Sequence, residues 1–181
     1  EVTSQGAIMH RHRFINFDAL IFTNIAPEHI EAHGSYEKYV SAKLSIALAV
    51  VQSRKKPTIL VANADDQHAG DFLAKNFTEK HTYSLDNAKP YNIFDSGFAM
   101  TVRGTLIKSP LSGEFNILNT LSAIILADTQ NVSLETSKRA IEKLKMIPGR
   151  VEKIDEGQNF TVVVDYAHTS DSLQKFYNIF H

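Results

Sequence analysis

The sequence predicts an α/β fold built on a parallel sheet. Two short apolar segments, at 18–24 and 58–63, have the composition of strands that are buried in a sheet. Each is followed by a segment with helical character, and the longer of these has apolar residues at steps of three and four. Strands that alternate with helices in this way are typical of a parallel sheet.

The first half of the chain contains the elements of this sheet in order. We predict strands at 18–24, 58–63 and 81–85, a helix at 35–53 and a short helix at 66–76. The longer helix has an apolar stripe made of Tyr36, Tyr39, Val40, Ile46, Ala47 and Val50.

The second half changes character after residue 92. Short strands punctuated by glycine between 92 and 110 suggest an antiparallel ribbon laid on the edge of the sheet. Helices are expected at 116–128 and at 133–144, where Ser133 is the predicted N-cap. The segment MIPGR at 146–150 breaks the helical pattern, so we predict one domain at 1–147 and a second at 148–181. Strands at 151–155 and 160–165 and a helix from about residue 170 complete the second domain.

Composition excludes several classes of protein. A net charge of −1 gives no reason to expect nucleic acid or an anionic membrane as a partner. The chain has no cysteine, which rules out disulfides and thiolate metal sites. The longest apolar run, near 46–51, is too short to cross a bilayer.

Lys43 lies on the apolar stripe of the long predicted helix, where an unpaired ammonium is costly to bury. Its ammonium group must extend to water or pair with a carboxylate, or else its amine must be chemically modified. Glu1, His29 and a Lys43 that has added carbon dioxide would supply oxygen and nitrogen ligands suited to magnesium or manganese. Spacing alone favours the simpler interpretation, in which the lysine reaches water and the histidine lies in a loop.

Two further groups suggest nucleotide binding. Asn116 and Asn119 lie three residues apart at a helix start, so both amides can face a base edge; alternatively Asn116 is only an N-cap. Asp165 follows an apolar strand, where open α/β sheets bind ligands, and it could hold ribose hydroxyls. The alternative for Asp165 is again an N-cap for the next helix.

Six segments in the chain resemble the Mur ligases, in the branch of the UDP-N-acetylmuramyl-tripeptide synthetases (MurE type). The most specific of them is DYAHT followed by DSL, and the segments lie at 1–6, 22–43, 63–66, 113–119, 148–152 and 164–173. The resemblance implies the second half of a central ATPase domain, followed by the start of a Rossmann-like C-terminal domain. It also implies a cytoplasmic enzyme.

The implied reaction is ATP-dependent amide bond formation on a cell-wall precursor. ATP phosphorylates UDP-MurNAc-L-Ala-D-Glu, and a diamino acid attacks the acyl phosphate. The resemblance assigns roles to nine residues. It makes Glu1, His29 and carbamylated Lys43 the ligands of Mg²⁺, and His29 and Lys43 also catalytic residues. It implies that Asn116 and Asn119 contact adenine, Arg150 a phosphate, Asp165 the ribose, and Thr3 and Arg11 the UDP-sugar peptide.

The chain also departs from the family pattern. Met9 stands where a glutamine that contacts the substrate is usual, and Thr3, Glu28 and Ser170 replace serine, aspartate and proline. No glycine is followed by lysine, so the phosphate loop is missing, and we expect a fragment that is inactive without flanking domains. Two alternatives remain open: a related amide ligase such as a cyanophycin or folylpolyglutamate synthetase, or a non-catalytic nucleotide-binding module.

Overall fold

The computed structural model describes residues 1–28 and 30–180, apart from the side chain of Ile30. It confirms the α/β class. The chain divides into two compact units, Glu1–Ser84 and Leu85–His181. The domain boundary predicted after residue 147 lies inside the second unit and stays a prediction.

The first unit contains the predicted parallel sheet. Its strands are β1 (Ala19–Phe22), β2 (Ile59–Asn63) and β3 (Glu79–Tyr83), in the order β1-β2-β3. Both pairs are parallel, with Ala19 opposite Ile59 and Ile59 opposite Glu79. The central strand β2 is buried throughout, as its continuous apolar sequence predicts.

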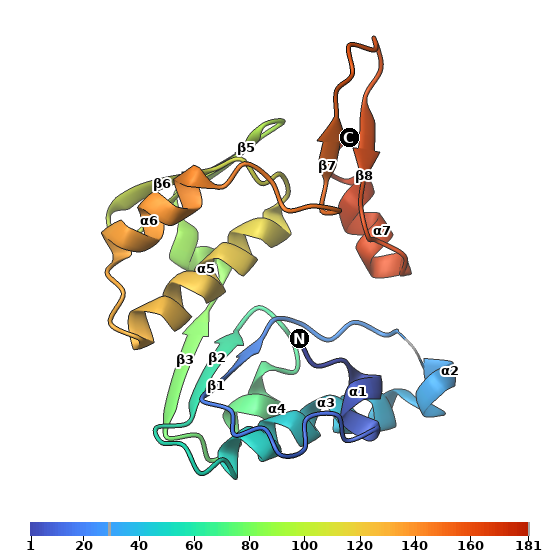
Figure 1. Cartoon of the computed structure of the whole chain (residues 1–181), viewed down its shortest axis with the longest axis vertical. Helices are drawn as coiled ribbons and strands as arrows, with labels where there is room; N and C mark the ends of the chain where they lie inside the picture. Colours follow the sequence, from blue (N-terminus) through green and yellow to red (C-terminus); the bar gives the residue numbers. More distant parts are fainter. Residues whose placement is uncertain (29, 181) are drawn as a thin grey trace. The chain divides into compact units, whose positions relative to one another are not determined.

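The described residues of this unit form four helices: α1 (Ser4–Ile8), α2 (Ile30–His33), α3 (Tyr36–Val51) and α4 (Ala69–Leu73). Figure 1 shows α1, α3 and α4 on one side of the sheet. Ser35 caps α3, because its side chain accepts a hydrogen bond from the amide of Lys38. The core between these helices and the sheet is formed by Phe22, Ile25, Tyr39, Val40, Ala47, Val50, Leu60, Ala62, Ala69, Phe72 and Phe77.

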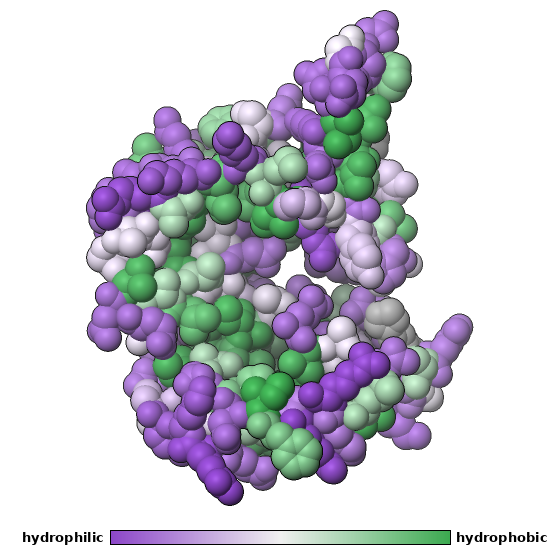
Figure 2. Space-filling model, viewed as in Figure 1, coloured by the Kyte–Doolittle hydropathy of each residue, from purple (hydrophilic) through white to green (hydrophobic). Residues whose placement is uncertain are grey.

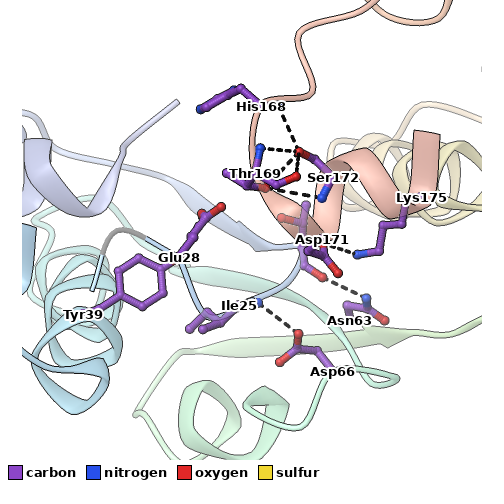
Figure 3. A network of polar contacts seen from close by, with 11 residues as sticks. Ile25, Glu28, Tyr39, Asn63, Asp66, His168, Thr169, Asp171, Ser172 and Lys175 are labelled. Carbon is purple, nitrogen blue, oxygen red and sulfur yellow. Dashed lines mark hydrogen bonds and ion pairs between the residues drawn. The ribbon is translucent and has the colours of Figure 1, made fainter. Parts of the chain in front are cut away.

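Side chains fasten the carboxyl ends of the parallel strands. Asn63 donates its side-chain amide to the carbonyl of Thr23 at 2.8 Å, and the hydroxyl of Tyr83 donates to the carbonyl of Phe22 at 3.2 Å. The amide of Ile25 donates to Asp66 at 2.9 Å (Figure 3). The loop that leaves β1 therefore starts from a fixed position at the edge where parallel sheets usually bind ligands.

The second unit begins with η1 (Leu85–Ala88) and a separate antiparallel sheet, β4 (Tyr91–Phe94), β5 (Gly97–Val102) and β6 (Thr105–Ser109). The predicted antiparallel pairing is confirmed, and these three strands form a sheet of their own, separate from the parallel sheet. The tight turn at Arg103 and Gly104, both with positive φ, pairs β5 with β6, and β4 pairs with the other edge of β5. Both edges of β5 are thus filled by its neighbours in sequence.

The remaining elements of the second unit are α5 (Glu114–Thr129), α6 (Leu134–Lys143), β7 (Glu152–Ile154), β8 (Val162–Val164) and α7 (Ser170–Tyr177). Ser133 caps α6 as predicted, accepting a hydrogen bond from the amide of Thr136. Figure 2 shows that the outer face of α6 is hydrophilic. β7 and β8 form an antiparallel hairpin. Within the described residues, no helix is both long and apolar enough to cross a membrane.

Candidate functional site

Lys43 is half-buried on α3. Its side chain borders the buried stripe, and its Nζ lies 5.4 Å from the centroid of the Tyr39 ring. A cation above an aromatic face is stabilised by the ring quadrupole. Among the described residues, no carboxylate forms an ion pair with Lys43.

Tyr39 is completely buried beneath Lys43, at 0% exposure. Its hydroxyl donates a hydrogen bond of 3.0 Å to Oε1 of Glu28, as Figure 3 shows. Burial raises the pKa of Tyr39 above its ordinary value, and the hydrogen bond to Glu28 raises it further. The phenol consequently stays a neutral donor.

Two of the three predicted metal ligands, Glu1 and Lys43, are among the residues that the structure describes. Glu1 is exposed at the first residue, whereas His29 lies outside the described residues. Over 1–28 and 30–180, no cluster of three or more His, Asp or Glu side chains could hold a metal. The set of Glu1, His29 and Lys43 stays a prediction. Its donor chemistry fits a hard cation such as Mg²⁺, provided that Lys43 carries a carbamate.

Thr3 and Arg11 lie at the two ends of one short segment around α1. Thr3 caps α1, and its Oγ1 accepts a hydrogen bond of 3.0 Å from the amide of Gly6. Arg11 is exposed, and its Nη2 lies 3.5 Å from the sulfur of Met9. The Thr3 hydroxyl can still donate its proton to a ligand, because only its acceptor side is used.

A polar group that the sequence did not reveal connects α3 to α4. The hydroxyl of Tyr36 lies 2.8 Å from Nε2 of His68, and Nδ1 of the same ring lies 2.9 Å from Asp71. The ring is thus held on both sides by Tyr36 and Asp71, and the backbone amide of His68 donates to Asp66 at 2.8 Å. His68 and Asp71 are close in sequence, but nothing in the periodicity indicates Tyr36 as their partner.

The two asparagines of the second unit contact each other. The N-cap of α5 is Gly113, with φ of 96°, so the alternative role of Asn116 as an N-cap was wrong. Asn116 is buried and donates to the carbonyl of Ser112 at 2.7 Å. Asn119 is exposed, and its amide reaches Oδ1 of Asn116 at 3.4 Å. Asn116 thus holds the loop before α5, while Asn119 faces solvent.

Asp165 forms bonds to two backbone amides. One carboxylate oxygen accepts from Val151 at 2.7 Å and the other from Ala167 at 2.6 Å. The N-cap of α7 is Thr169, so the alternative role of Asp165 as an N-cap was also wrong. Thr169 and Ser172 form a capping box at the start of that helix (Figure 3).

Arg150 lines a small cavity of the same unit whose side chains are mostly cationic among the charged ones. Its guanidinium lies 5.0 Å from the centroid of the Tyr166 ring. The cavity has a volume of about 280 Å³ and is lined by three cations, Lys145, Arg150 and Lys153, and by one acidic residue, Asp95. The remaining lining residues are Ser96, Pro110, Leu111, Ser112, Met146 and Val151. A concave surface with this excess of positive charge favours an anionic group such as a phosphate.

Comparison with known proteins identifies the family. A family model described as the Mur ligase middle domain matches residues 1–127. The chain belongs to the Mur ligase family. This finding confirms the resemblance that the sequence motifs indicate.

The relatives include Mur ligases of the MurE type. The UDP-N-acetylmuramoyl-L-alanyl-D-glutamate–2,6-diaminopimelate ligase of Halalkalibacterium halodurans is 33% identical over 96% of this chain. The corresponding L-lysine ligase of Staphylococcus aureus is 33% identical over 97%. The chain spans 37% of the length of each of these relatives.

Solved structures of Mur ligases share the fold. A UDP-N-acetylmuramoyl-L-alanyl-D-glutamate–2,6-diaminopimelate ligase matches with a TM-score of 0.74 and 26% identity, covering 99% of this chain and 38% of that one. MurF from Acinetobacter baumannii matches with a TM-score of 0.76 over 91% of this chain and 37% of that one. Its identity of 16% supports the fold alone.

Proposed function

We propose that this chain is part of an ATP-dependent ligase that adds a diamino acid to UDP-MurNAc-L-Ala-D-Glu. The observation that carries the proposal is 33% identity, over nearly the whole chain, to ligases named for that addition. In this assignment residues 1–147 form the second half of the central ATP-binding domain, and residues 148–181 begin the C-terminal domain.

ATP is proposed to bind through residues of the second unit. Asn119, supported by Asn116, contacts the adenine edge, and Asp165 contacts the ribose. Both oxygens of Asp165 already accept backbone amides, but each has a second lone pair for a ribose hydroxyl. Arg150 contacts a phosphate, in keeping with the cationic cavity that it lines.

The metal site is proposed in the first unit. Glu1, His29 and the carbamate of Lys43 would hold Mg²⁺, which would neutralise the charge that develops as the acyl phosphate forms. His29 and carbamylated Lys43 are the proposed catalytic residues. Thr3 and Arg11 hold the UDP-sugar peptide, and Met9, which lies against the Arg11 guanidinium, replaces a polar contact with an apolar one.

The test uses the complete reading frame that contains this chain. We expect phosphate release from ATP that requires both UDP-MurNAc-L-Ala-D-Glu and a diamino acid, with meso-diaminopimelate and L-lysine tried separately. Arg150→Ala should lower kcat/KM at least about tenfold, because it removes a charge-assisted phosphate contact. The matched control is Arg139→Ala, an exposed arginine on α6. Turnover with another acid, and none with this nucleotide-sugar dipeptide, would refute the proposal.

A further inference from the structure

The side chain of Arg150 lies against an aromatic ring. Its guanidinium carbon is 5.0 Å from the centroid of the Tyr166 ring. An aromatic face attracts a guanidinium through the ring quadrupole and also stacks on its planar surface. Because arginine stays protonated in proteins, this contact holds the side chain in the charge state that binds a phosphate.

One carboxylate fixes the backbone on both sides of this contact. An oxygen of Asp165 accepts a hydrogen bond of 2.7 Å from the amide of Val151, which directly follows Arg150. The other oxygen accepts a bond of 2.6 Å from the amide of Ala167, which directly follows Tyr166. The arginine and the ring therefore extend from backbone segments that Asp165 ties together.

A tight turn leads into Arg150. The amide of Arg150 donates to the carbonyl of Ile147 at 3.0 Å, and Gly149 within the turn has φ of +69°. A proline followed by a glycine with positive φ is typical of a type II turn. The amide of Gly149 also donates to Oε2 of Glu152 at 2.7 Å. The backbone at Arg150 is thus well held, which leaves its long side chain as the part whose position depends on the Tyr166 ring.

The Tyr166 ring is 66% exposed, but it has a neighbour of its own. The ring of His168 packs edge-on against it, with centroids 5.0 Å apart and planes at 76°. Nδ1 of His168 donates to the carbonyl of Tyr166 at 2.8 Å. Over 1–28 and 30–180, the Tyr166 hydroxyl has no hydrogen-bond partner. The contacts of this side chain are therefore made by the ring.

Arg150 lines the cavity of about 280 Å³ together with Lys145 and Lys153. In the part of the chain that the structure describes, none of these three cations forms an ion pair with a carboxylate. Their charge is available to an anionic ligand. An arginine that is already ordered beside the cavity loses less conformational freedom when such a ligand binds.

We infer that Tyr166 is a positioning residue that holds the Arg150 guanidinium ready for a phosphate at this cavity. The inference rests on the proposed function, in which Arg150 contacts a phosphate of ATP. Tyr166 acts through Arg150 and does not itself contact the nucleotide. Because the ring performs this role without its hydroxyl, phenylalanine should replace Tyr166 and an aliphatic residue should not.

An arginine that lies on an exposed ring is also an ordinary surface contact. In that interpretation Arg150 reaches the phosphate equally well without the ring. If Tyr166 is a positioning residue, an aliphatic side chain in its place leaves Arg150 mobile, and nucleotide binding must then order it. The two interpretations therefore differ in the mobility of Arg150 in the nucleotide-free protein.

Two readouts test the role of the ring in the protein encoded by the complete reading frame. The first is the mobility of Arg150 without nucleotide, measured by ¹⁵N relaxation of Nε and assigned with Arg150→Ala. The second is ATP affinity, measured by isothermal titration calorimetry without the acid substrate. In Tyr166→Leu we expect an Nε order parameter below about 0.6 and ATP affinity about three- to fivefold lower. Tyr166→Phe should keep both values close to native.

Phe160→Leu is the matched control, because it removes a ring that is also 66% exposed, from the loop of the same hairpin. It should leave both readouts unchanged. Amide exchange at Val151 checks that Asp165 still holds the backbone in Tyr166→Leu. The double variant with Arg150→Ala should bind ATP no more weakly than Arg150→Ala alone, since Tyr166 acts through the arginine.

The outcomes distinguish this inference from the proposed function. Suppose that Arg150→Ala weakens ATP binding, while Tyr166→Leu leaves Arg150 ordered or adds its own loss in the double variant. That result would overturn the positioning role alone. Native ATP affinity in Arg150→Ala would overturn the proposed phosphate contact, and the inference with it.

Discussion

Asp165 accepts a hydrogen bond of 2.7 Å from the backbone amide of Val151. Val151 has φ of +48°, a conformation that β-branched residues rarely adopt. The second oxygen of the carboxylate accepts from Ala167 at 2.6 Å. The proposed ribose contact thus also holds the strained start of the β7–β8 hairpin in place.

We expect Asp165→Ala to release both amides. Hydrogen exchange at Val151 and Ala167 should become roughly tenfold faster, because hydrogen bonds to a charged group contribute about 1.5–3 kcal/mol. Exchange measured by NMR reports this directly. Asp155→Ala is the control, since that exposed carboxylate accepts from Gly157 in the same hairpin. Unchanged exchange at Val151 would show that the strained turn does not depend on Asp165.

Substitutions of the two asparagines of α5 should differ in their effect on the free energy of unfolding, although both should lower ATP affinity. Asn116→Ala removes a buried hydrogen bond to Ser112 and should lower the free energy of unfolding by about 1–3 kcal/mol. Asn119→Ala removes an exposed side chain and should change it by no more than about 0.5 kcal/mol. Denaturant unfolding measures both, and ATP affinity should fall in both variants. A stable Asn119→Ala with native affinity would exclude Asn119 from the adenine site.

Tyr39 should make the protein sensitive to alkaline pH. Unfolded tyrosine ionises at a pKa of about 10, whereas burial and Glu28 keep the folded phenol protonated at higher pH. Its stabilising effect is complete below about pH 10 and is lost as pH rises from there toward the folded pKa, because only the unfolded chain then releases the proton. Denaturant unfolding between pH 9 and 11 should therefore show a shallower decline in Tyr39→Phe than in the native protein. Parallel curves would contradict the raised pKa.

Gly97 should tolerate no side chain at the start of β5. Its φ is +138°, and an added Cβ would lie 1.9 Å from the carbonyl oxygen of Ser109. We expect Gly97→Ala to destabilise by roughly 3 kcal/mol or more, through a clash with backbone that cannot move aside. Gly104→Ala is the matched control: its φ is +78° with nothing within 4 Å, so only the backbone cost of about 1–2 kcal/mol applies. Thermal unfolding of both variants gives the comparison, and equal losses would refute the clash.

Local patterns predicted the elements of the parallel sheet to within a few residues. The continuous apolar sequence of β2 and the apolar stripe of α3 are strong signals, because both elements are buried in the core. β3 was predicted too late, at 81–85 instead of Glu79–Tyr83, because its first residues are exposed and polar. α4 is shorter than predicted, since Asp66 and His68 take part in turn hydrogen bonds before it.

The candidate site was less predictable than the fold. The contact between Asn116 and Asn119 follows from their helical spacing, but the caps of α5 and α7 are Gly113 and Thr169, which local sequence preference did not single out. The bond between Tyr39 and Glu28 depends on the path of the loop before α2. No periodic pattern encodes such a path, so the structure was needed to find the connection.

The arrangement of the parallel sheet also bears on how the protein is made. The pairing of β1 with β2 places Ala19 opposite Ile59, so it can form only after β2 has been synthesised. All three strands of the sheet are present once Tyr83 has been added, before any residue of α5 exists. The pairing of these three strands therefore involves no residue of the second unit. Until β2 is present, the edge of β1 that it will occupy is unpaired and can pair with another strand instead.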